Sequence, residues 1–85
     1  MNYVYLIRSE SDPSRTYIGM TEDLKKRLQS HNEGANKHTS KYRPWKLECY
    51  IAFTSRKQAA EFEKYLKQGS GHAFAKRHFW NSNTQ

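Results

Sequence analysis

An arginine and a histidine lie on a predicted helix face that otherwise carries leucines. In the segment 21–34, Leu24 and Leu28 mark the apolar stripe of an amphipathic helix. At about 100° per residue, Arg27 and His31 fall within or beside this stripe. Burying an arginine costs free energy unless its guanidinium group meets an anion. The spacing therefore indicates that a cation and a titratable ring face the sheet, where they can bind an anion.

A second predicted helix carries a carboxylate on its apolar face. The stripe of the segment 55–69 consists of Ala59, Phe62 and Leu66. Glu63 falls on this stripe, whereas Glu61 points away from it. A carboxylate in that position needs a cation or hydrogen-bond donors.

These inward polar residues have two interpretations. In the first, Arg27, His31 and Glu63 line one polar pocket beside tyrosine-rich strands. In the second, Arg27 and Glu63 form a buried structural ion pair, and His31 is bound to a backbone carbonyl. Periodicity alone does not decide between the pocket and the pair.

Three strands are predicted to support these helices. The segments 3–7, 16–19 and 46–53 are rich in aromatic and β-branched residues, which is typical of strands. The intervening segment 9–15 is rich in Ser, Asp and Pro, so it predicts the turn of a hairpin between the first two strands.

Local signals set the expected bounds of the helices. Thr21 is the predicted N-cap of the first helix, and Gly34 its end. Ser55 is the predicted N-cap of the second helix, which Gly69 and Gly71 end. The remaining predicted segments are a basic polar loop at 38–44, a short helix or turn at 73–79, and a polar, frayed tail at 81–85.

The 85 residues are expected to form one domain, with a net charge of +7 from 15 Lys and Arg against 8 Asp and Glu. The excess positive charge lies after Met20, which favours a polyanionic partner, although a merely soluble basic protein has the same composition. The candidate nucleic-acid-binding residues are Lys26, Lys37, Lys41, Arg43, Lys67, Lys76 and Arg77.

Cysteine usage and hydropathy predict a cytoplasmic setting. Cys49 is the single cysteine, and its place in a predicted strand indicates a packed structural thiol rather than a nucleophile. No apolar run approaches membrane-spanning length, and the N-terminus lacks a signal-peptide pattern. We therefore expect no membrane partner and a reducing compartment.

Four motifs in order resemble the GIY-YIG nuclease family over about residues 3–79. Val4-Tyr5-Leu6 and Tyr17-Ile18-Gly19 resemble the paired signature, with Val4 in the place of its first glycine. The segment 21–32 resembles the family's arginine-bearing helix, including the histidine, and 59–67 resembles its glutamate-bearing helix. The segment 69–74 is similar to the part that follows in small single-domain bacterial members.

The resemblance implies an α+β (mixed α/β) fold, with a small three-stranded antiparallel sheet flanked by helices. It also implies that Glu63 holds one divalent metal ion, Mg²⁺ or Mn²⁺, with Glu61 as the rival by sequence. Arg27 then binds the scissile phosphate, and Tyr5 and Tyr17 flank the attacking water. His31 assists proton transfer or holds a tyrosine, and the division of roles among the three rings stays open.

The chemistry of phosphodiester hydrolysis fits these residue types. The reaction concentrates negative charge on phosphate oxygens, which the planar fork of Arg27 can bind. One carboxylate is sufficient for Mg²⁺, which keeps most of its waters.

We therefore expect a metal-dependent endonuclease that acts on nucleic acid, most readily DNA and, as in some similar proteins, single-stranded DNA. The alternatives are a non-cleaving nucleic-acid-binding module of the same fold and a basic protein of ribonucleoprotein assemblies. Strong site specificity would require a protein partner or a dimer.

Overall fold

A three-stranded antiparallel sheet forms the centre of the protein. The computed structural model describes residues 1–80, so the predicted tail at 81–85 lies outside the described residues. The strands are β1 (Asn2–Ser9), β2 (Thr16–Thr21) and β3 (Trp45–Phe53), in the spatial order β2-β1-β3. The predicted fold class is confirmed, and each strand extends beyond its predicted bounds because pairing continues past its apolar centre.

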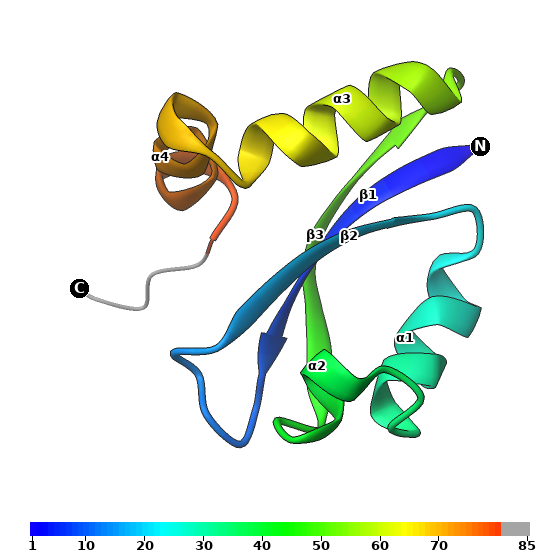
Figure 1. Ribbon diagram of the computed structural model, residues 1–85, viewed down its shortest axis with the longest axis vertical. Helices are drawn as coiled ribbons and strands as arrows, with labels where there is room; N and C mark the ends of the chain where they lie inside the picture. Colours follow the sequence, from blue (N-terminus) through cyan, green and yellow to red (C-terminus); the bar gives the residue numbers. More distant parts are fainter. Residues whose placement is uncertain (81–85) are drawn as a thin grey trace.

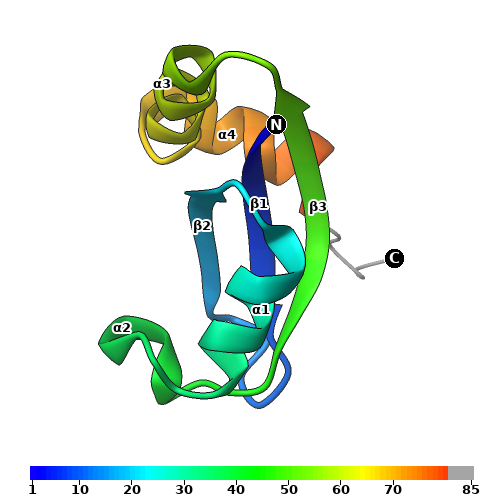
Figure 2. The same ribbon diagram turned by 90° about the vertical axis from the view of Figure 1, so that its right-hand side faces the viewer.

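Helices cover both faces of this sheet (Figures 1 and 2). The helices are α1 (Leu24–Asn32), α2 (Lys37–Ser40), α3 (Arg56–Leu66) and α4 (Gly69–His78). Residues of α3 and α4 pack in one apolar cluster with Val4, Leu6 and Ile18. Leucines of α1 pack in a second cluster with Tyr5 and Ile7, on the opposite face. Across residues 1–80, every helix falls short of the length and apolar character that a membrane span needs.

The N-terminal caps show one correction and one confirmation. Thr21 was the predicted cap of the first helix, but it ends β2, and Asp23 is the N-cap because its carboxylate accepts a hydrogen bond from the Lys26 amide. Thr21 Oγ1 instead accepts a bond from the Asp23 amide, at 3.1 Å, and shapes the turn between strand and helix. Ser55 caps α3 as predicted, by accepting a bond from the Gln58 amide.

Two segments are more helical than the sequence indicated. The predicted loop at 38–44 begins with α2, since the side chain of Asn36 caps that helix through the His38 amide. Gly69 and Gly71 were predicted to end the preceding helix, but both belong to α4. Gly71 is buried, and a Cβ atom there would overlap the backbone of Tyr65, so this glycine permits close packing of α3 and α4.

A β-bulge in β3 lets one strand supply both apolar clusters. The register of β1 with β3 shifts between Leu6, which pairs with Cys49, and Ile7, which pairs with Leu47. Glu48 is therefore the additional residue, and it forms an ion pair with Arg8 at 2.7 Å. Trp45 and Leu47 face the α1 side, whereas Cys49, Ile51 and Phe53 pack on the α3 side. Burial raises the pKa of the Cys49 thiol, which agrees with a packing role for this cysteine.

Candidate active site

Tyr5 and Gly19 lie opposite each other on neighbouring strands, on the face that α1 covers. A Cβ atom at position 19 would overlap the Tyr5 hydroxyl oxygen and lie 2.6 Å from the ring carbon that carries it. The absent side chain of Gly19 therefore makes room for the Tyr5 ring to extend across β2. Glycine is needed here for space, since this residue has no unusual backbone conformation.

We expect Gly19→Ala to destabilise the protein by about 1–3 kcal/mol, because the added methyl group overpacks the contact with Tyr5. Thermal and denaturant unfolding measure the free energy of unfolding. In a Tyr5→Leu background, the same substitution should cost much less, since the shorter side chain leaves the space free. An equal cost in both backgrounds would show that the contact with Tyr5 is not the cause.

His31 forms the centre of a buried group of rings. It is 1% exposed, and its Nε2 atom lies 2.8 Å from the Tyr5 hydroxyl oxygen. The Tyr17 ring meets the His31 ring edge-on, with centroids 5.1 Å apart, and lies 6.3 Å from the Tyr5 ring. The structure thus brings together three of the residues that the sequence singled out, from β1, β2 and α1.

The second ring nitrogen of His31 binds a residue that the sequence analysis missed. His31 Nδ1 lies 2.8 Å from Thr39 Oγ1, and Thr39 is itself 1% exposed, in the short helix α2. The indole Nε1 atom of Trp45 donates to the Thr39 carbonyl oxygen at 2.8 Å. The expectation that His31 is bound to a backbone carbonyl is therefore wrong, because two hydroxyl groups occupy its ring nitrogens. No helical or strand period links residues 31 and 39, so only the cap of α2 at Asn36 could have indicated this contact.

Arg27 lies at the surface beside this buried group. It was predicted to face the interior, but it is exposed, and its Nη1 atom donates to the Met20 carbonyl oxygen at 3.3 Å. Two clefts of about 300 and 310 Å³ adjoin it, and Thr21, Asp23 and Arg27 line both. The long side chain extends out from the edge of the apolar stripe, which keeps the guanidinium group available to an external anion.

Burial and charge set the protonation states of the inner rings. Burial raises the pKa of the Tyr5 hydroxyl, while the nearby Arg27 guanidinium acts in the opposite direction. Burial lowers the pKa of His31, and the nearby positive charge of Arg27 lowers it further. At neutral pH, Tyr5 is therefore a protonated phenol and His31 a neutral imidazole, which can accept a proton.

Glu63 approaches the same site from α3. Its carboxylate is 23% exposed and forms an ion pair with Lys67, one helical turn away, at 2.7 Å. The Lys67 ammonium lies 5.6 Å from the centroid of the Tyr17 ring, and the Glu63 charge acts to raise the Tyr5 pKa. Among residues 1–80, the ion pair of Glu63 is with Lys67 rather than with Arg27. This finding overturns the interpretation of Arg27 and Glu63 as a buried structural pair.

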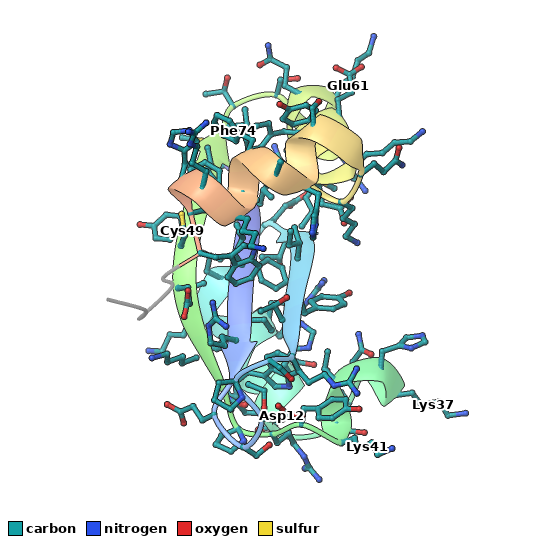
Figure 3. All side chains as sticks on the ribbon, turned by 90° about the vertical axis from the view of Figure 1, so that its left-hand side faces the viewer. Asp12, Lys37, Lys41, Cys49, Glu61 and Phe74 are labelled. Atoms are coloured by element: carbon teal, nitrogen blue, oxygen red, sulfur yellow. The ribbon has the colours of Figure 1, made fainter. Side chains whose placement is uncertain are left out.

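The surroundings of Glu63 are suitable for a hard divalent ion that keeps its waters. The carboxylate is reachable from solvent, and its partner Lys67 is 45% exposed and free to turn away. No cluster of three or more His, Cys, Asp and Glu side chains with metal-binding geometry occurs in the described part of the chain. A single carboxylate fits Mg²⁺ or Mn²⁺. Glu61, the rival by sequence, points away from the sheet at the outer side of α3 (Figure 3).

The predicted nucleic-acid-binding residues fall into three groups. Lys26 lines a cleft beside Arg27, and Lys67 lies at Tyr17. Lys37, Lys41 and Arg43 belong to α2 and the segment after it, where Lys37 and Lys41 project outward (Figure 3). Lys76 and Arg77 are in the last turn of α4, on the opposite face of the sheet from α1 (Figure 1). The structure therefore brings the first two lysines to the site and places Lys76 and Arg77 elsewhere.

Comparisons of this chain with a family sequence model and with the sequences of known proteins indicate the same family. The sequence model of the GIY-YIG catalytic domain matches residues 1–77. The structure-specific endonuclease subunit SLX1 of Candida dubliniensis is 40% identical, over 92% of this chain and 28% of its own length. A UPF0213 protein of Clostridium perfringens is 35% identical, over 80% of this chain and 72% of its own length.

One solved structure has a similar fold. The solution NMR structure of a UPF0213 protein from Bacillus halodurans gives a TM-score of 0.53 at 29% identity, and the match covers 91% of this chain and 82% of that one. The chain spans about a quarter of the length of the Candida dubliniensis SLX1 subunit, and 10% of that from Mycosarcoma maydis, which is 44% identical over 69% of this chain.

Proposed function

The chain belongs to the GIY-YIG family, and from this premise we propose that it is an endonuclease that hydrolyses phosphodiester bonds in nucleic acid with one divalent metal ion. The observation that carries the proposal is the cluster of Tyr5, Tyr17 and His31 beside the exposed Arg27 on one face of the sheet. The charge of Glu63, from α3, acts on Tyr5. We take residues 1–85 as a single nuclease domain, with its core at about 3–79.

In this proposal, Arg27 binds the phosphate. Its exposed guanidinium group lies next to the Tyr5 hydroxyl and faces open clefts, where a phosphodiester can approach. A planar fork can donate to two phosphate oxygens and stabilise the charge that develops on them. Its neighbour Lys26 lines one of these clefts and adds positive charge for the flanking backbone.

In this proposal, the tyrosines and the histidine position the attacking water and accept its proton. The Tyr5 hydroxyl lies at the boundary between the buried His31 and the exposed Arg27, so it can contact a water molecule on the solvent side. The neutral His31 can accept a proton from Tyr5, and the raised pKa of Tyr5 and the lowered pKa of His31 keep both groups in their neutral forms before the reaction. Tyr17 closes the other side of the ring group and supports the orientation of His31.

Glu63 is the residue that would hold the metal ion, after Lys67 has moved from its carboxylate. When bound, a divalent ion supplies positive charge for the phosphate and for the leaving oxygen. The released Lys67 ammonium remains beside the Tyr17 ring, where it can contact the nucleic-acid backbone.

The proposed substrate is DNA, with single-stranded DNA as the finer expectation. The exposed basic residues of α2 and the segment after it, Lys37, Lys41 and Arg43, lie with Tyr42, which suits a path for a flexible backbone with one stacking ring. Since the SLX1 relatives are named as subunits and are much longer, we also propose that site selection depends on a protein partner or on a second copy of the chain.

A non-cleaving binding module is the alternative function. Glu63 argues against it, because a carboxylate beside a phosphate site weakens the binding of nucleic acid unless a cation lies between them. The pair of Glu63 with Lys67 gives the alternative its support, since an ion pair removes most of that repulsion.

We expect the purified protein to cleave nucleic acid in Mg²⁺ or Mn²⁺ and to be inactive in EDTA. The test incubates it with single-stranded, duplex and branched DNA and with single-stranded RNA, and separates the products by size. A protein that binds these substrates but leaves them intact with either metal would establish the non-cleaving alternative. Cleavage in EDTA would contradict the metal requirement.

A further inference from the structure

Three buried side chains form a hydrogen-bonded chain that ends at the backbone of the α2 N-cap. The Tyr5 hydroxyl oxygen lies 2.8 Å from His31 Nε2. His31 Nδ1 lies 2.8 Å from Thr39 Oγ1, and the Thr39 hydroxyl donates to the Asn36 carbonyl oxygen at 3.4 Å. Tyr5, His31 and Thr39 are each at most 2% exposed, whereas the nearby Arg27 is exposed to solvent.

The donors and acceptors give this chain a direction. The hydroxyl hydrogen of Thr39 is used by the carbonyl oxygen of Asn36, as is common for threonine in a helix, so Thr39 Oγ1 accepts a hydrogen bond from His31 Nδ1. With its hydrogen on Nδ1, the neutral His31 ring accepts at Nε2 from the Tyr5 hydroxyl. With the opposite tautomer, the Tyr5 hydrogen would face another N–H group.

Thr39 is held by contacts that do not involve His31. Its carbonyl oxygen accepts a hydrogen bond from Trp45 Nε1, and its amide donates to the Asn36 carbonyl oxygen at 3.2 Å. Asn32 adds a second link, because its side chain bonds both the amide and the carbonyl oxygen of Trp45. The Thr39 oxygen therefore has a fixed position, and its burial excludes a water molecule that could replace it.

We infer that Thr39 is a positioning residue, which holds His31 in the tautomer protonated at Nδ1 and so keeps Nε2 as the proton acceptor for Tyr5. The groups that face His31 are Tyr5 of β1, Tyr17 of β2, Arg27 of its own helix and Thr39 of α2. Thr39 is the one among them that bonds Nδ1.

The catalytic consequence rests on the proposed nuclease function. As an O–H bond of the attacking water breaks, its proton passes to the Tyr5 oxygen, and the Tyr5 hydrogen passes to His31 Nε2. The water oxygen forms a bond to phosphorus, the bond from phosphorus to the leaving oxygen breaks, and that oxygen takes a proton from solvent. His31 then returns its proton to solvent through Tyr5, so that no net charge remains on the protein.

Nuclear magnetic resonance of the histidine rings tests the inference without any substrate. In the ¹⁵N-labelled protein at neutral pH, we expect His31 to show a protonated Nδ1 and a bare Nε2. His38, His72 and His78 are exposed and provide internal references, and His31→Gln identifies the resonances of His31. A protonated Nε2 in the wild-type protein would overturn the inference, whether or not any variant folds.

Two substitutions of Thr39 distinguish the effect of its hydroxyl group from the effect of its side-chain volume. Thr39→Val keeps the shape but removes the acceptor, so we expect protonation at Nε2 to appear in the His31 spectrum. We expect turnover to fall by about 10- to 100-fold, as happens when the outer partner of a functional histidine is lost, with KM little changed. Thr39→Ser keeps the hydroxyl group and should restore both the spectrum and the rate.

The histidine spectra test the role of Thr39, and the cleavage assay tests the proposed function, so each hypothesis can be contradicted without the other. An unchanged His31 spectrum and rate in Thr39→Val would overturn the inference, even in an active enzyme. If the wild-type protein cleaves no substrate, the proposed function is wrong, whereas the tautomer and its dependence on Thr39 are still decided by the spectra.

Discussion

Replacing Glu63 by Gln is expected to abolish cleavage and to leave the folded protein intact. The substitution keeps the size of the side chain but removes the charge that would hold the metal ion. A metal ion at a phosphate contributes several kcal/mol of transition-state stabilisation, so a loss of about 4 kcal/mol corresponds to roughly a thousandfold fall in rate. The ion pair with Lys67 is partly exposed, so its loss should hardly change the melting temperature.

Calorimetric titration with Mn²⁺ measures the effect on metal binding directly. Glu61→Gln is the matched control, because it makes the same change two residues away on the outer side of α3. We expect the control to bind Mn²⁺ and cleave like the wild-type protein, and Glu63→Gln to do neither. Equal affinity for Mn²⁺ in the wild-type protein and Glu63→Gln would remove Glu63 from the metal site.

The second large effect is expected for Arg27→Lys, which keeps the positive charge and loses the planar fork. Turnover should fall by two or more orders of magnitude, on the order of 3 kcal/mol, because an ammonium group cannot donate to two phosphate oxygens in the same geometry. The side chain is exposed, and within residues 1–80 its hydrogen bond is to the Met20 carbonyl oxygen. The melting temperature should therefore change little.

Arg56→Lys is the control for charge in the same surface cleft, since Arg56 lines the cleft of about 300 Å³ together with Arg27 but belongs to α3. Cleavage rates and melting curves of both variants distinguish a phosphate-binding group from a structural one. A drop of several degrees in melting temperature for Arg27→Lys, with turnover unchanged, would show that its role is to support the fold.

The sequence was sufficient to predict the three strands and the two main helices, because residue composition and periodicity are local properties, and the family was predicted from the resemblance of its ordered motifs. Glu63 and Glu61 could be told apart for the same reason, since residues two apart on a helix point in different directions. The exposure of Arg27 could not be predicted, because a long side chain on the edge of a stripe can turn inward or outward. Its actual direction depends on the Met20 carbonyl oxygen, which comes from β2.

The role of Thr39 could not be predicted, for a different physical reason. Its contact with His31 depends on α2, a helix of four residues that lies within a segment of polar and basic side chains. Such a segment has no apolar period, and its helix forms because Asn36 caps it and Trp45 binds its last turn. The role of Thr39 depends on two hydrogen bonds to residues distant in the sequence. Such contacts give no periodic residue pattern from which the role could be predicted.

The bulge at Glu48 has a consequence for how the length of β3 can vary. Trp45 and Phe53 are separated by an even number of positions, yet they pack on opposite faces of the sheet, because the additional residue reverses the alternation between them. Deleting the additional residue would leave the tryptophan that holds α2 and the phenylalanine beneath α3 an odd number of positions apart, and simple alternation would then still place them on opposite faces. Homologous chains can therefore lose the residue at the bulge and keep both apolar layers, without the ion pair between Glu48 and Arg8, whereas a residue gained or lost elsewhere in a strand that keeps the bulge would turn one end of the strand over.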